Sequence, residues 1–103
     1  MTILNTTLTN STASNIYASS GTSAITTIHL CNFSANTQTV NVYIVPGGSI
    51  ASSNNIIYSN VTVTAYNTYI VYAEKFILSN GDSIKANTGN ASVVSATVSS
   101  IGI

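Results

Sequence analysis

The chain has 103 residues, of which 45% are hydrophobic and 4% are charged, and its formal net charge is zero. Ordinary globular domains are about 25% charged, and most catalytic chemistry uses carboxylates, histidines, lysines or reactive thiols. We therefore expect one folded, non-enzymatic domain that binds no cofactor and no metal. Nucleic acid is also excluded as a partner, because 2 cationic side chains cannot form the basic patch that neutralises phosphates.

Membrane insertion and secretion find no support in the sequence. No apolar run approaches the roughly 18 residues of a membrane span, and residues 1–5 lack the features of a signal peptide. We therefore expect synthesis in a cytoplasm and no membrane partner. The single cysteine, Cys31, excludes an internal disulfide bond.

Residues 1–14 are predicted to form an N-terminal arm that becomes ordered on assembly. Few apolar side chains stand among their Thr, Asn and Ser residues, namely Ile3, Leu4, Leu8 and Ala13. Burying them would not offset an ordering cost of about 1–2 kcal/mol per residue for the backbone. The two short runs 2–4 and 7–9 can instead pair with the sheet edge of a neighbouring molecule.

Residues 15–103 read as short strands that are separated by polar turns. The expected strands are 15–18, 23–33, 39–45, 56–64, 68–72, 76–78, 83–86 and 92–103, with a first irregular strand or arm over 2–9. In the strand 23–33, Ile28 and Leu30 share one face, and His29, Cys31 and Phe33 share the other. In the last strand, Val94, Ala96 and Val98 share one face.

The spacing of these segments predicts the fold class. Seven or eight short strands with a turn signal every 8–12 residues are typical of a single antiparallel β-sandwich, of jelly-roll or immunoglobulin-like type. One of these turns, at 79–82, carries an Asn-Gly pair.

The candidates for chemistry each have a structural alternative that we favour. His29 and Cys31 could bind a metal or form a nucleophile pair, but the preferred interpretation is a packed histidine and a buried, inert cysteine. Glu74 and Asp82 could act as paired acids. Because Lys75 and Lys85 stand beside them, we instead predict a solvated hairpin.

Tyrosines gather in one part of the chain and mark a candidate interface. Tyr58, Tyr66, Tyr69 and Tyr72 fall within fifteen residues, and aromatic side chains are enriched at interfaces and on sugar-binding faces. Half-buried strand tyrosines are the commoner explanation. The predicted interface residues are Ile3, Leu4, Leu8, Tyr58, Tyr66 and Tyr69.

Four segments carry a resemblance to a known group of proteins. They are residues 28–34 (Ile-His-Leu-Cys-Asn-Phe-Ser), 40–48 (Val-Asn-Val-Tyr-Ile-Val-Pro-Gly-Gly), 55–58 (Asn-Ile-Ile-Tyr) and 78–86 (Leu-Ser-Asn-Gly-Asp-Ser-Ile-Lys-Ala). Together they resemble small β-sandwich structural proteins of tailed bacteriophage particles, over residues 15–103. The chain departs from the usual Pro-Ala-Gly-Lys turn at 18–22.

The resemblance implies a β-sandwich that is installed in many copies on a capsid or tail. Our first choice is a capsid decoration protein that binds the assembled shell. The resemblance carries over no active site, and it places the protein in the virion after synthesis in the host cytoplasm. Expected partners are further copies of the chain, as a trimer or on a lattice, and virion proteins such as the major capsid or tail proteins. The alternatives are a tail, neck or fibre-associated structural module and a carbohydrate-binding adhesin domain.

Overall fold

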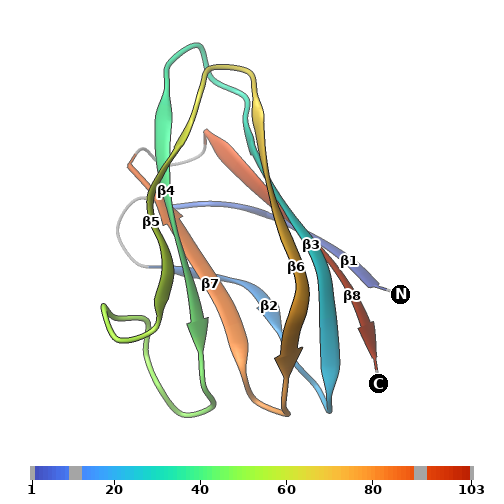
Figure 1. Ribbon diagram of the computed structural model, residues 1–103. Coiled ribbons are helices and arrows are strands. Elements are labelled where there is room, and N and C mark those ends of the chain that lie inside the picture. The colour runs from blue at the N-terminus through green and yellow to red at the C-terminus, as the bar shows by residue number, and fades with distance from the viewer. Residues whose placement is uncertain (1, 10–12, 90–92, 103) are drawn as a thin grey trace.

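A computed structural model describes residues 2–9, 13–89 and 93–102, with the side chains of residues 2 and 72–75 outside the description. Within these residues the chain forms eight strands and no helix (Figure 1). The strands are β1 (Thr2–Thr7), β2 (Ser14–Ala18), β3 (Ser23–Asn32), β4 (Gln38–Val45), β5 (Ile56–Val63), β6 (Thr68–Leu78), β7 (Ser83–Thr88) and β8 (Val94–Gly102). The prediction of an all-β fold with seven or eight strands is confirmed.

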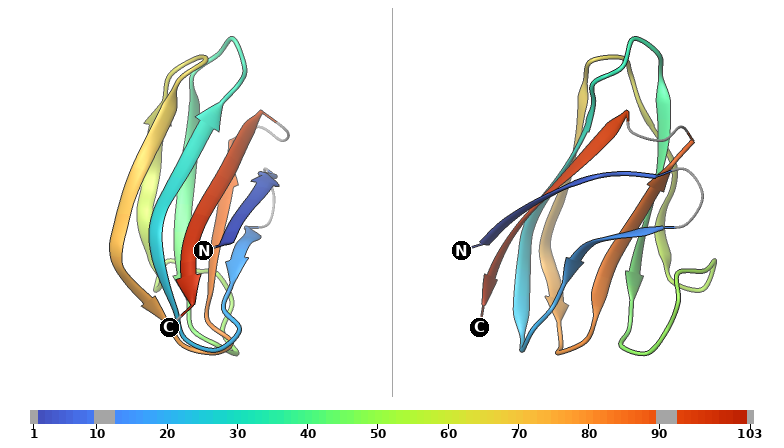
Figure 2. Two further views of the ribbon diagram at one scale, coloured as in Figure 1. Left: turned by 90° about the vertical axis from the view of Figure 1, so that its right-hand side faces the viewer. Right: turned by 180° about the vertical axis from the view of Figure 1, so that it is seen from behind.

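The strands form two four-stranded antiparallel sheets that pack against each other. Sheet A has the order β1-β8-β3-β6 and sheet B the order β2-β7-β4-β5 (Figures 1 and 2). The pairs β1–β8, β2–β7, β3–β6 and β4–β5 are nested inside one another, as in a long hairpin that folds over on itself. This is the jelly-roll order. An immunoglobulin-like sandwich instead places its first and last strands in different sheets.

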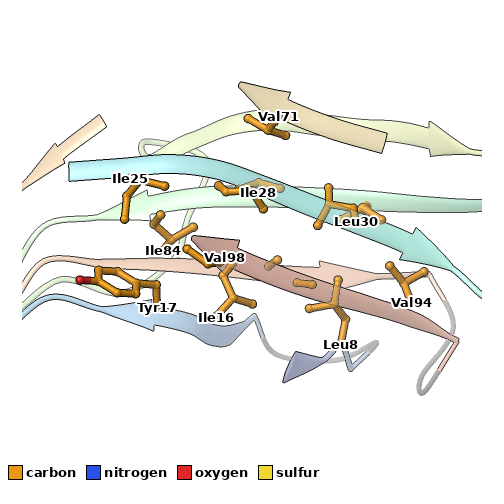
Figure 3. Packing of buried hydrophobic residues seen from close by; sticks show 14 of the residues in the cluster. Leu8, Ile16, Tyr17, Ile25, Ile28, Leu30, Val71, Ile84, Val94 and Val98 are labelled. Carbon is orange, nitrogen blue, oxygen red and sulfur yellow. The ribbon is translucent and has the colours of Figure 1, made fainter. Parts of the chain in front are cut away.

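Alternating apolar residues from both sheets fill the space between them. Ile28 and Leu30 on β3 and Val94, Ala96 and Val98 on β8 are fully buried, as their spacing predicts (Figure 3). Sheet B contributes Val40, Val42, Ile84 and Ala86, which are also fully buried. Burial of the apolar face of each sheet is the main force that holds such a sandwich together.

A β-bulge in β3 decides which residues of this strand reach the core. The register of β3 shifts between Ile25 and Thr27 against both of its neighbours, β6 and β8. Strict alternation from Ile28 would turn Ile25 outward, but the extra residue, Thr26, reverses the side on which Ile25 lies. Ile25 is therefore fully buried beside Ile28.

Strand β6 is longer than the sequence predicts. Residues 68–78 form one strand. Glu74 and Lys75 therefore belong to β6 and not to the solvated hairpin in which we expected them. Pairing with β3 explains the difference, because it resumes beyond the bulge with Ile25 opposite Phe76 and Ala24 opposite Ile77.

The N-terminal segment belongs to the sandwich, which differs from the predicted boundary after residue 14. Strand β1 pairs with β8 of the same chain, with Ile3 opposite Ser99, and Leu8 beyond it is fully buried. Counting apolar side chains alone omits the backbone hydrogen bonds that an open sheet edge offers. Residues 1 and 10–12 of the predicted arm lie outside the described residues. An exchange of β1 between molecules stays a prediction.

Candidate interaction surface

The residues considered for catalysis do not come together into a reactive group. His29 and Cys31 are both partly exposed on the outer surface of sheet A. The expectation of a buried cysteine is therefore wrong, because Cys31 alternates with the core residue Leu30. Among the described residues, no three His, Cys, Asp or Glu side chains are grouped as a metal ion would need.

Asp82 holds two turns together, a role that the sequence analysis missed. Its Oδ1 accepts a hydrogen bond from the Gly47 backbone N–H at 2.9 Å, and its Oδ2 accepts one from the Ser79 N–H at 3.0 Å. Both bonds involve a charged acceptor, which strengthens them. The side chain of Glu74, its predicted partner, is not among the described side chains. Asp82 therefore acts as a link between the β4–β5 and β6–β7 connections.

The β2–β3 turn joins the same network. Ser19 donates its N–H to the Asp82 carbonyl at 2.8 Å and accepts from the Gly81 N–H at 3.0 Å. The Gly21 N–H donates to Asn80 Oδ1 at 3.0 Å. Three connections are thus tied together at the lower end of the sandwich in Figure 1.

Asn32 links two connections at the opposite end of the sandwich, where its side chain is fully buried. Its Nδ2 donates to the carbonyl oxygens of Asn36 at 2.8 Å and Val63 at 2.9 Å. Its Oδ1 accepts from the N–H and the hydroxyl of Ser34, at 2.9 and 2.7 Å. The sequence placed Asn32 only near the end of the expected strand 23–33. The structure makes its amide the link between the β3–β4 and β5–β6 connections.

Two of the predicted interface tyrosines are used within the fold. The rings of Tyr58 on β5 and Tyr69 on β6 meet edge to face, with centroids 6.4 Å apart, and both pack against the core. They close the side of the sandwich where the edge strands of the two sheets meet. Tyr66 stands apart in the β5–β6 connection, 73% exposed and with a φ of 57°.

The remaining predicted interface residues differ in exposure. Ile3 is 62% exposed and Leu4 is 39% exposed, but Leu8 is a core residue. Of the six predicted residues, only Ile3, Leu4 and Tyr66 therefore present a largely open side chain to a partner.

An open hollow of about 460 Å³ lies in the β4–β5 connection, and it is lined by that connection's own residues, among them Pro46, Ile50 and Asn55. The Asn55 amide is already used, because it donates to the Ile50 carbonyl at 2.9 Å and accepts from the Ser52 N–H at 3.0 Å. Its described lining residues include no aromatic ring, the side chain on which sugars commonly stack.

Exposed apolar side chains gather on sheet A. Nine large hydrophobic residues are exposed among the described residues. Five of them, Ile3, Leu4, Ile70, Ile77 and Ile101, lie on β1, β6 and β8, whereas sheet B has one, Ile57, and the connections have three. Leu4 lies opposite the core residue Val98 and so faces the inner side, whereas the other four lie on the outer side of the sheet. An antiparallel sheet normally has one apolar face and one polar face, so these four isoleucines are unusual for a solvated outer face.

We define the A face as the outward side of sheet A. Its side chains alternate with the core residues, and Figure 2 (left) shows its four strands side by side. The described members are Ile3, Asn5, Thr7, Ala24, Thr27, His29, Cys31, Thr68, Ile70, Ile77, Ser95, Thr97, Ser99 and Ile101. None of these carries a fixed charge.

The outer face of sheet B has a different character. Asn41 donates from Nδ2 to Asn87 Oδ1 at 3.0 Å and accepts from the Asn60 N–H at 2.8 Å. Lys85 lies on the same face, opposite Tyr43. This surface carries a charged side chain and a hydrogen-bonded amide cluster, so the A face is the stronger candidate for contact with a partner.

Comparisons with known proteins give no match from which a function could be transferred. No family model matches the chain, and neither the curated proteins nor the solved structures that were searched give a match. Within the described residues, no helix has the length and apolar character to cross a membrane.

Proposed function

We propose that this chain is a non-enzymatic structural protein of a tailed bacteriophage particle, a capsid decoration protein that binds the assembled shell in many copies. The observation that carries the proposal is the A face, whose described members include exposed isoleucines and hydroxyl side chains and no charged residue, unlike an ordinary solvated sheet. Large exposed apolar patches mark interaction sites in folded proteins.

The fold is consistent with this role. Jelly rolls recur in viral capsid proteins, although they also occur in lectins and cupins, so the fold alone does not decide the function. The resemblance of residues 28–34, 40–48, 55–58 and 78–86 to phage structural proteins favours the first of these settings.

The charge of the chain supports a multi-copy role. With a formal net charge of zero, neighbouring copies on a lattice do not repel one another.

The side chains of Asp82 and Asn32 hold the connections in place at the two ends of the sandwich through hydrogen bonds. A module with fixed connections loses little conformational entropy when it attaches.

Binding to particles tests the proposal. The purified chain is mixed with phage particles that lack it, and sedimentation separates bound from free protein. We expect saturable binding that changes little with salt, because salt screens charges and the chain has only 2 cationic and 2 acidic side chains. Failure to bind both shells and tails contradicts the proposal. Binding to tails alone favours a tail, neck or fibre-associated module.

One observation favours a carbohydrate-binding adhesin as a second candidate. Tyr66 is the most exposed aromatic ring among the described residues, and it sits at a positive φ, a conformation that is found more often at functional sites. The isolated protein is tested on a glycan array beside the Tyr66→Ala variant. If the array retains the unchanged protein but not the Tyr66→Ala variant, the result supports a carbohydrate-binding adhesin. If it does not retain the unchanged protein, Tyr66 does not have this role.

A further inference from the structure

We propose that the A face pairs with the A face of a second copy about a twofold axis, so that two sandwiches stack sheet on sheet. This inference deepens the proposed function and rests on it for the idea of a multi-copy building block: it assigns the A face to contact between copies and leaves the other surfaces for attachment to the particle. Its test uses the isolated protein, so a failure to pair is distinguishable from a failure to attach to particles.

A continuous apolar row crosses the A face. Ala24 on β3 lies opposite Ile101 on β8 and opposite Ile77 on β6, so three apolar side chains stand side by side across three strands. Ile77 is 58% exposed and Ile101 is 42% exposed. Ile3 lies diagonally next to Ile101, since its direct partner on β8 is Ser99. Directly and diagonally opposed side chains on a sheet face are close enough to touch.

The polar groups of the A face are partly bonded within the chain. Thr97 Oγ1 donates to Asn5 Oδ1 at 2.8 Å. Thr26, at the bulge in β3, donates its hydroxyl to the Ser99 carbonyl at 3.0 Å. Polar groups that already have partners cost less to remove from water than free ones do. These two bonds lower the polar cost of covering the part of the face around β1, β8 and the bulge.

Charge favours a second copy as the occupant. The two charged side chains that the structure describes, Asp82 and Lys85, lie in the β6–β7 turn and on the outer face of sheet B. A charged partner surface would lose its hydration on binding, and the described residues of the A face offer it no ion pair in return. A second copy presents the same uncharged described residues, which carry no such penalty.

The size of the A face suits a pair. Four strands about 4.8 Å apart, each about nine residues long at about 3.3 Å per residue, give about 570 Å² per copy. Pairing then buries about 1,100–1,200 Å² in total, near the lower limit of specific interfaces. Identical sheets stack in this way with strands close to aligned, and a twofold axis makes each contact occur twice. We therefore expect a dimer that forms at micromolar concentration.

Cys31 supplies a reporter on the A face, because it is the only cysteine of the chain and is partly exposed. Its reaction with a thiol reagent is followed as protein concentration rises, in parallel with sedimentation. Pairing covers the A face, so labelling should slow as the dimer forms. A rate that is independent of concentration, together with a monomer in sedimentation, overturns the proposal.

Matched lysine variants distinguish the A face from other apolar surfaces. Ile77→Lys places a charge in the apolar row of both copies, and we expect it to weaken pairing by at least about a hundredfold. Ile50→Lys is the control, because Ile50 is 77% exposed but lies in the β4–β5 connection. It should pair like the unchanged chain. Equal weakening by both variants, or a trimer in sedimentation, contradicts face-to-face pairing. Thermal unfolding confirms that each variant is folded.

Discussion

The Asp82 carboxylate accepts a hydrogen bond at 2.9 Å from the backbone N–H of Gly47, which lies 35 positions earlier in the chain. This bond joins the connection between β4 and β5 to the turn between β6 and β7. At the lower end in Figure 1, this carboxylate therefore joins the two connections to each other, while Ser19 and Asn80 hold the β2–β3 turn to the β6–β7 turn.

Asp82→Ala should lower the free energy of unfolding by about 1–3 kcal/mol, because two backbone N–H groups lose a charged acceptor. Asp82→Asn should cost less, since its amide keeps one acceptor oxygen. Urea unfolding measures both. Ser53→Ala, at an exposed position of the β4–β5 connection, is the matched control. Equal stability of all three variants would mean that Asp82 does not hold the turns together.

Two glycines in these turns should respond differently to the same substitution. Gly81 has a φ of 92°, which an L side chain rarely adopts, so Gly81→Ala should cost about 1–2 kcal/mol. Gly47 has no such φ, and an added Cβ would meet the Gly81 backbone at an ordinary 3.4 Å. Gly47→Ala should therefore be better tolerated. Thermal unfolding compares the two, and the reverse order would refute the assignment of strain to Gly81.

Asn32→Ala should be among the most damaging single changes in the connections. It removes the donor for the carbonyls of Asn36 and Val63 and the acceptor for Ser34, all at a fully buried site. We expect a loss of about 2–4 kcal/mol in the free energy of unfolding, measured in urea. Asn36→Ala keeps the carbonyl that accepts from Asn32 and serves as the control. A loss below about 1 kcal/mol for Asn32→Ala would contradict the role of its amide.

Thr88→Val should stabilise the protein. The Thr88 hydroxyl is buried on β7 and has no hydrogen-bond partner among the described residues, and Val has nearly the same shape. Removing an unsatisfied buried hydroxyl should raise the free energy of unfolding by about 1 kcal/mol. Thr88→Ser, which keeps the hydroxyl and loses a methyl group, should instead destabilise. A Val variant that is less stable than the unchanged chain would show that the hydroxyl has a stabilising role.

Removal of residues 1–7 should leave the sandwich folded, although less stable. Most described side chains of β1 are exposed, so its loss mainly removes backbone pairing with β8. Leu8→Ala should destabilise by about 2–5 kcal/mol, because Leu8 is a core residue. Circular dichroism and urea unfolding test both. If β1 also exchanges between molecules on assembly, the truncated chain attaches more weakly to particles. Equal attachment would leave β1 without a role in assembly.

The layered fold was predictable from the sequence because alternation is a local property. The spacing of Val94, Ala96 and Val98 identifies the core face of β8 without knowledge of its neighbours. The position of Ile25 was not predictable in this way. Its burial depends on a bulge that is set by pairing with two other strands. The length of β6 was missed for the same reason, since its far half is stabilised by β3.

The candidate surface was harder to predict than the fold. The sequence pointed to Ile3 and Leu4, but it could not show that Tyr58 and Tyr69 turn toward each other. Ile77 and Ile101 lie 24 positions apart, and only the order of the strands places them on either side of Ala24. The roles of Asp82 and Asn32 likewise depend on carbonyl and N–H groups from distant turns, and no local pattern marks these partners.

The central claim is that this chain is a structural component of a phage particle, and imaging the particle tests it most directly. Purified particles from a culture that expresses the chain are examined by single-particle cryo-electron microscopy. We predict density for an eight-stranded jelly roll, repeated in many copies on the outside of the shell or, in the alternative, on the tail. Particles that carry no such density, while the chain stays behind in the particle-free lysate, would contradict the account.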